Sequence, residues 1–248
     1  MPVSQLSSGE GAHRQFATTH WSMVVAARDR ESPQAHEALA GLCTAYWYPL
    51  YAFIRRQGYE AHDAQDLTQE FFSRLLEKDF LGTVDPEKGK FRSYLLVCCK
   101  HFLANERDKA GAARRGGGRT VISVDFMDAE SRYGCESAHV LPADKLYERR
   151  WAMSLLEMVL GRLRDEFERD GKKLLFDRLK STLAGSRTAA SYAELGAELD
   201  LSEGAIKVIV HRLRRRYREL LREEIGRTVS DPAEVDAEIR ELFVLLSS

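Results

Sequence analysis

The chain has 248 residues, of which 44% are hydrophobic and 30% are charged, and its formal net charge at pH 7 is −1. This length allows two modest domains, and the composition is typical of a soluble protein with real cores. Because the net charge is so small, nucleic-acid binding would have to come from local clusters of Lys and Arg. No apolar stretch approaches the roughly 20 residues of a membrane helix, and residues 1–15 lack the apolar core of a signal peptide. We therefore expect a cytoplasmic protein that does not interact with membranes.

The sequence predicts neither a metal site nor a catalytic site. Cys98 and Cys99 are adjacent within an apolar run, which indicates reduced and largely buried side chains. Cys135 and His139 have the spacing of metal ligands, but no second ligand pair lies near them. The glycines at 116–118 do not match a phosphate-binding loop, and no Ser/His/Asp arrangement stands out. We expect no cofactor, no metal and no enzymatic activity.

The N-terminal part of the chain is predicted to form one helical domain. Residues 1–16 are polar and rich in Ser and Gly, so we expect them to be disordered. Helical spacing of apolar residues then predicts a domain over 17–115. Pro49 interrupts its first helix, where a kink or a break is expected because proline has no N–H. Three helices are expected in this domain: Ser32–Gln57, Asp63–Lys78 and Phe91–Arg107.

The Asp63–Lys78 helix is strongly amphipathic. Leu67, Phe71 and Leu75 are expected to point inward, and Phe72 is a further candidate for the inner face. The polar side chains are expected to point outward: Asp63, Asp66, Gln69, Glu70 and Arg74. An acidic face beside an exposed part of Phe71 or Phe72 suits the docking of a helical partner. The alternative is an ordinary solvated helix face.

A linker and a second helical domain follow. Residues 116–147 are expected to be a linker with local order at best, since the strand-like stretch at 121–126 has no partner strands. The helical period returns at Leu146 and predicts a domain over 148–227. Asp231 and Pro232 then begin a last helix within a C-terminal extension over 228–248, with proline at its first position.

Residues Ser191–Arg222 have the pattern of a helix-turn-helix. A short helix is followed by a break, and Ser202 is a good N-cap for a second helix. Between Ala205 and Arg222 there are seven Lys and Arg residues but one acid. The cationic and polar side chains expected away from the apolar face are Lys207, His211, Arg212, Arg215 and Arg218. This pattern is typical of a helix that enters the DNA major groove, and the alternative is an amphipathic helix with a solvated basic face.

These segments resemble a known family, the bacterial RNA polymerase sigma factors of the extracytoplasmic-function group. DAQDLTQEFFSRLLE at 63–77 is similar to the family's helix that docks on core polymerase. SYAELGAELDLSEGAIKVIVHRLRRRYRELL at 191–221 is similar to its region 4 helix-turn-helix, which reads the upstream promoter element. Between them, residues 91–115 are similar to the helix that binds and melts the downstream element. The resemblance covers about 20–115 and 148–225.

The resemblance implies an all-α protein in which a sigma region 2 domain and a region 4 helix-turn-helix domain are joined by a flexible linker. It implies a sigma factor that binds core RNA polymerase and directs promoter-specific initiation on duplex and melted DNA, and it allows an anti-sigma factor as a further partner. The implied polymerase-binding residues are Asp63, Asp66, Gln69, Glu70 and Phe71. The implied DNA-binding residues are Lys207, Val208, His211, Arg212, Arg215, Lys100, Asn105, Arg107, Arg114 and Arg115.

The chain departs from the family pattern on the melting helix and on the recognition helix. The family usually has Trp at the position of Tyr94, Asn at His101 and Asp at Asn105, so the downstream sequence preference should differ. A melting helix needs cations for phosphates and aromatic or polar groups for an unstacked base. Phe91 and Tyr94 are weak candidates for that role because such aromatics are usually core residues. On the recognition helix, apolar Val208 suits contact with thymine methyl groups.

A second hypothesis stays open. The chain would then be a stand-alone helix-turn-helix regulator whose N-terminal domain serves dimerisation or sensing. Such a dimer should protect two half-sites about one helical turn apart without polymerase. A sigma factor should bind duplex DNA weakly until polymerase is present.

Overall fold

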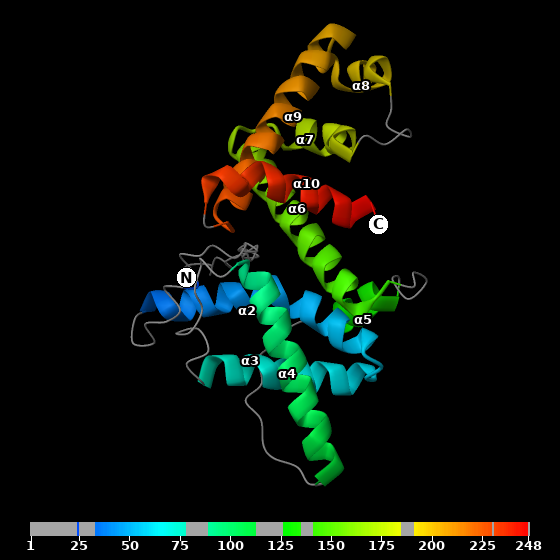
Figure 1. Ribbon diagram of the computed structural model, residues 1–248. Helices are drawn as coiled ribbons and strands as arrows, with labels where there is room; N and C mark the ends of the chain where they lie inside the picture. The colour runs from blue at the N-terminus through cyan, green and yellow to red at the C-terminus, as the bar shows by residue number, and fades with distance from the viewer. Residues whose placement is uncertain are drawn as a thin grey trace, which may run out of the picture.

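The computed structural model describes residue 24 and residues 33–77, 89–112, 126–134, 141–184, 191–229 and 231–247. Every element within these ranges is a helix (Figure 1), which confirms the all-α class. The α-helices are α2 (Pro33–Arg56), α3 (Ala61–Glu77), α4 (Phe91–Ala112), α5 (Phe126–Gly134), α6 (Ala143–Arg169), α7 (Lys173–Leu179), α8 (Tyr192–Leu199), α9 (Glu203–Gly226) and α10 (Val235–Ser247). The predictions for residues 1–16, for 121–125 and for the Cys135–His139 pair lie outside the described residues.

An aromatic core holds together the first module, which comprises α2, α3, α4, α5 and the first half of α6. Helix α2 packs against α3 and α6, and α3 also packs against α4. Tyr46, Phe53 and Phe72 are almost completely buried where these helices meet. Helix α2 does not end at Pro49. The deep burial of Tyr46 and Phe53 on either side of the proline gives the physical reason, because tertiary packing outweighs the one backbone hydrogen bond that proline removes.

Part of the segment predicted as a linker is helical and packed. Ala129 and Tyr133 of α5 are buried. Glu130 accepts hydrogen bonds from the Arg55 guanidinium at 2.7 and 3.1 Å, and it accepts one from the Tyr51 hydroxyl. The Arg55 guanidinium also lies 4.8 Å from the centre of the Tyr133 ring. Tertiary contacts of this kind stabilise a short helix whose nine residues are too few to be stable alone.

Helix α6 belongs to both modules, since its second half forms the second module together with α7, α8 and α9. Its 27 residues span roughly 40 Å at 1.5 Å per residue. In its first half, the Tyr147 hydroxyl donates a hydrogen bond to the Arg92 carbonyl of α4 at 3.0 Å. Its second half packs against α9, α7 and α10, so the helix runs from one module into the other (Figure 1). The predicted four-residue period is confirmed, since Trp151, Leu155, Val159 and Leu163 are all buried.

The second module has a smaller, mostly aliphatic core. Phe167 of α6 packs on Phe176 of α7 with ring centres 5.8 Å apart. Helix α8 packs on α9, and the buried residues of α9 include Ile206, Val210 and Leu213. The predicted start of the C-terminal helix is confirmed: the Asp231 side chain accepts a hydrogen bond from the Ala233 N–H at 2.8 Å, in a 3-10 turn over Pro232–Glu234 that leads into α10.

Candidate nucleic-acid interface

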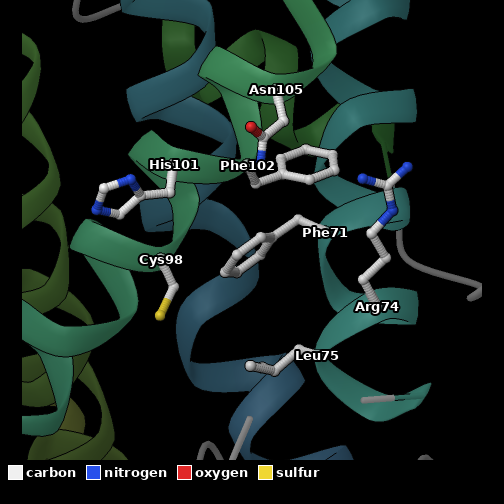
Figure 2. A pocket seen from close by; sticks show the side chains of 7 residues that line it. All are labelled: Phe71, Arg74, Leu75, Cys98, His101, Phe102 and Asn105. Atoms are coloured by element: carbon white, nitrogen blue, oxygen red, sulfur yellow. The ribbon is translucent and has the colours of Figure 1, made fainter. Parts of the chain in front are cut away.

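A pocket of about 280 Å³ opens between α3 and α4. Its walls are mainly apolar, and its lining residues are Phe71, Arg74, Leu75, Cys98, His101, Phe102 and Asn105. Figure 2 shows Phe71 reaching from α3 toward α4, with the polar side chains of His101 and Asn105 at the α4 side. His101 and Asn105 are exposed on α4, whereas Phe71 and Phe102 are buried. The result is an apolar hollow with polar groups at its rim.

Arg74 is fixed at one side of this pocket. Its guanidinium lies 4.9 Å from the centre of the Phe102 ring and pairs with Glu70 at 2.8 Å and with Glu106 at 2.7 Å. Burial disfavours the charged form of Glu106, but hydrogen bonds from Arg74 and Lys109 outweigh that effect and lower its pKa. Arg74 therefore joins α3 to α4 and holds the Phe102 ring in the pocket wall.

The five predicted polymerase-binding residues divide into two groups. Asp63 is exposed in the first turn of α3, and Asp66 and Glu70 are partly exposed on successive turns of the same helix. Phe71 is buried in the pocket wall, which confirms its predicted inward orientation. The outward prediction for Gln69 is wrong, because its side chain is buried at 7% exposure. The buried stripe of α3 is wide enough to include Gln69 beside the fully buried Thr68 and Phe72.

The cations predicted on α4 are accessible but already have partners. The Lys100 ammonium pairs with Asp144 of α6 at 2.6 Å. The Arg107 guanidinium donates to the Tyr59 hydroxyl at 3.0 Å and lies over the Tyr59 ring. Both side chains are exposed, so the ion pair of Lys100 and the tyrosine contacts of Arg107 can exchange for phosphate contacts. Arg114 and Arg115 lie outside the described residues.

The two aromatic candidates on α4 differ in accessibility. Phe91 is buried at 3% exposure and packs edge-on against Tyr46, with ring centres 5.6 Å apart. It is a core residue and is not available to hold a base. Tyr94 is half-buried beside Phe91. The pocket between α3 and α4 is apolar and open, so it is a better candidate than Phe91 for holding a base.

The turn between α8 and α9 depends on side-chain caps and on one glycine. The Ser191 hydroxyl accepts a hydrogen bond from the Glu194 N–H at 3.2 Å, and the Glu194 carboxylate accepts one from the Ser191 N–H at 2.7 Å. The predicted N-cap of α9 is confirmed, since the Ser202 hydroxyl accepts from the Ala205 N–H at 3.2 Å. A Cβ added at Gly196 would lie 2.6 Å from the Leu201 carbonyl oxygen. Glycine therefore lets the turn pass close to α8.

One side of α9 forms an accessible, largely basic ridge. All five residues predicted there are exposed: Lys207, Val208, His211, Arg212 and Arg215. Lys207 pairs with Glu203 at 2.7 Å and Arg215 pairs with Glu219 at 2.9 Å, in both cases one turn away on α9 itself. Arg212 has no ion pair or hydrogen bond with any other residue in the described ranges. Among the cations of α9 predicted to bind DNA, Arg212 therefore differs from Lys207 and Arg215, which have partners within the described residues.

Two other arginines of α9 serve the fold, which sequence reasoning missed. Arg214 donates to the Thr182 carbonyl at 2.7 Å. Arg216 pairs with Glu166 of α6 at 2.7 Å, and its hydrogen bonds are the main reason why the pKa of Glu166 is lowered. The sequence offered a weak signal, since both arginines lie between the apolar and the exposed faces of the helix. Their partners come from distant segments and could not be inferred.

The described ranges contain no group of three or more His, Cys, Asp or Glu side chains that could hold a metal ion. Among the helices in those ranges, none has the length and apolar character needed to cross a membrane.

Cys43, Cys98 and Cys99 are free thiols. Burial raises the pKa of Cys43 to about 12, which keeps this thiol protonated at neutral pH.

Comparison with known proteins gives a family match for one part of the chain. Residues 42–112 match the family model of sigma-70 region 2, a span that includes all of α3 and α4 and the pocket between them. The match supports a sigma-70 family sigma factor with a role in transcription initiation. Region 2 of that family is a non-enzymatic initiation domain that binds core RNA polymerase and promoter DNA. No curated protein and no solved structure matches the chain.

Proposed function

We propose that the chain is a cytoplasmic sigma factor of the extracytoplasmic-function group, in which residues 148–227 act as a region 4 domain. The observation that carries the proposal is the order of features in one chain. A segment that matches sigma-70 region 2 is followed by a capped helix-turn-helix with an accessible basic ridge. Three surfaces would each have a separate physical role: the accessible side of α3, the pocket between α3 and α4, and the basic ridge of α9.

The first surface docks on core polymerase and is the accessible side of α3. Asp63, Asp66 and Glu70 give it negative charge over nearly two turns. Because Gln69 and Phe71 are buried, these two residues would act by shaping the helix and not by direct contact. The complementary partner is a basic helical surface, and charge complementarity of this kind sets orientation and association rate.

The second surface holds the melted strand and is the pocket between α3 and α4. Its volume of about 280 Å³ and its apolar walls suit one unstacked base. Asn105 and His101 at the rim offer hydrogen-bonding groups to the edge of such a base. Lys100 and Arg107 lie on the same helix as these rim residues, where they can contact the neighbouring phosphates.

The third surface contacts duplex DNA and is the basic ridge of α9. Lys207 and Arg215 would neutralise phosphates, and Arg212 is a candidate for a base edge because it lies between them along α9 and no described residue competes for it. Val208 is 50% exposed beside these cations and presents methyl groups to thymine. No covalent chemistry is involved, since binding energy would drive strand separation and DNA deformation.

A pull-down with core RNA polymerase tests the first role. The wild-type chain should co-purify with the core enzyme, and Asp66→Arg/Glu70→Arg should not, because it places cations on an acidic docking face. Asp177→Arg/Glu234→Arg reverses two exposed charges outside α3 and should bind like the wild type. Equal binding by all three proteins, or no binding by the wild type, would overturn the proposal.

A further inference from the structure

The C-terminal helix α10 contacts both modules. It packs against α6 and α9, and Figure 1 shows it crossing α6 between α9 and the first turn of α4. Val235, Leu242 and Leu245 are buried on its apolar side. Its acidic side chains, in contrast, meet cations from both modules. The helix therefore bridges the sigma region 2 match and the helix-turn-helix.

On the side of the first module, the bridge is a buried ion pair. Arg92 of α4 donates a hydrogen bond to Glu238, and both side chains are about 95% or more removed from solvent. The Arg92 guanidinium also lies 4.1 Å from the centre of the Trp151 ring of α6. Lys90 adds a second cation, at 2.6 Å from Glu238, and it pairs with Glu241 as well. Three helices thus meet at one guanidinium.

On the side of the second module, the bridge is more exposed. Asp236 accepts a hydrogen bond from Arg222 near the end of α9. This pair is the main reason why the pKa of Asp236 is lowered. The three acidic residues that reach cations outside α10 are Asp236, Glu238 and Glu241. They occur within six residues in the first half of α10, where Asp236 reaches α9 and Glu238 and Glu241 reach the cations at the start of α4.

Among the described helices, α6 also links the two modules. A single helix resists bending less well than a braced one, and Gly161 in its second half lowers its local helix stability. A buried ion pair adds little net stability compared with apolar packing, but it enforces one geometry, because any misalignment leaves a charge buried without its partner. Such a contact is suited to fixing an angle.

We propose that α10 is a brace that fixes the angle between the two modules and so restricts the promoter spacing that the protein accepts. This consequence for promoters rests on the proposed function, whereas the brace itself does not. One added base pair moves two DNA elements apart by about 3.4 Å and rotates them by about 35°. A rigid pair of modules is sensitive to such a change, and a hinged pair tolerates it.

The brace is tested by single-molecule energy transfer in the full chain without polymerase or DNA. Dyes attached through unnatural amino acids at Val97 on α4 and at Ala197 on α8 report the separation of the modules, since both positions are exposed. The wild type should give one narrow distance distribution. Glu238→Gln/Glu241→Gln should broaden it by an amount on the order of one helix diameter, about 10 Å.

Two further variants keep this test decisive. Glu234→Gln removes an exposed acid that has no ion pair within the described residues, and it should leave the distribution unchanged. Lys90→Gln/Arg222→Gln removes one cation from each side of the bridge and should broaden the distribution even if the double glutamate variant does not fold. If either double variant folds and its distance distribution is unchanged, the brace is overturned.

The consequence for promoters is tested by transcription from templates that differ only in spacer length. The wild-type holoenzyme should prefer one spacing, and Glu238→Gln/Glu241→Gln should accept spacings about one base pair longer and shorter as well. An identical spacer profile in the two proteins would overturn this consequence. A wild type that gives no selective transcription would instead contradict the proposed function and leave the distance measurement to decide on the brace.

Discussion

The two modules differ in the shape of their candidate DNA-binding surfaces. The first module has an aromatic core, and its candidate surface is a recessed apolar pocket whose nearby cations already have partners. The second module has a smaller aliphatic core, and its candidate surface is a projecting helix with an available arginine. A hollow suits a single unstacked base, whereas a ridge suits a duplex groove. Under the proposed function, the same chain would contain one surface for each state of the DNA.

The modules also differ in what holds them together. Large buried rings dominate the first, so its stability should depend on volume. The second depends on caps, on a close approach of backbones and on ion pairs to α6. Substitutions that remove buried volume should therefore destabilise the first module most, whereas changes to caps, glycines and ion pairs should destabilise the second.

Phe72→Ala should give the largest effect. The ring is completely buried between α3 and its neighbours, and removal of such a ring costs about 3–5 kcal/mol of unfolding free energy. Urea unfolding followed by circular dichroism measures the change. Val97→Ala, at a side chain that is 50% exposed, should change stability by no more than about 0.5 kcal/mol. Equal losses from both variants would contradict the packing described for the first module.

A pair of glycine substitutions should distinguish close backbone approach from helix propensity in the second module. Gly196→Ala should destabilise by about 1–3 kcal/mol, because its Cβ would collide with the Leu201 carbonyl oxygen. Gly204→Ala has room for its Cβ, with the nearest atom outside the helix backbone at 3.9 Å, and it should be neutral or stabilising by up to about 1 kcal/mol. Thermal unfolding of the two variants measures the difference. The turn geometry would be wrong if Gly196→Ala were the more stable of the two.

Substitutions along α9 should separate DNA-contacting arginines from structural ones. Arg212→Ala should weaken promoter binding by the holoenzyme by about 1–3 kcal/mol without altering protein stability. Arg222→Ala should have a smaller effect on binding, since its guanidinium is at the far end of the helix and pairs with Asp236. Filter binding and thermal unfolding measure the two quantities. Equal losses of affinity would mean that α9 does not lie in the groove as proposed.

Arg214→Ala gives the complementary control on α9. Its guanidinium donates to the Thr182 carbonyl, so its removal should lower stability by roughly 1–3 kcal/mol as the acceptor loses its partner. Binding per folded molecule should change less than in Arg212→Ala. A variant with full stability and lost binding would assign Arg214 to the DNA surface.

The smallest expected effect is a pH dependence at α5. Hydrogen bonds from Arg55 lower the pKa of Glu130 in the folded protein, below its value of about 4.5 in the unfolded chain. This contribution is therefore complete above that value and is lost as the pH falls through the folded pKa. Because Glu130 is partly exposed, its size should not exceed about 1 kcal/mol. Urea unfolding from pH 7 to about pH 3 should show a shallower acid-side loss in Glu130→Gln, while Glu234→Gln should follow the wild type.

The sequence predicted those features that depend on neighbouring residues. The Ser202 cap, the period of α6 and the exposure of Lys207, His211 and Arg212 all follow from local spacing. These features are governed by i to i+4 geometry, and tertiary contacts only reinforce them. The resemblance to a family added the order of the modules, and the region 2 match supports its N-terminal part.

Features that depend on distant residues could not be predicted. Gln69 lies at the edge of the buried stripe of α3, where the position of neighbouring helices decides its exposure. Helix α5 is too short for a period to be visible, and it depends on Arg55, which is 75 residues away from Glu130. The α3–α4 pocket likewise needs two helices at a particular distance. Such pairings are set by the fold as a whole.

The central claim is that this chain directs core RNA polymerase to promoters, and reconstituted transcription tests it most directly. Core enzyme, with and without the purified chain, is given a pool of random DNA fragments, and the transcribed and footprinted fragments are sequenced. The account predicts that initiation with the chain is concentrated on fragments that share two spaced elements, with protection that requires polymerase. Initiation no more selective than that of the core enzyme alone would contradict the account, as would polymerase-independent protection of two symmetric half-sites.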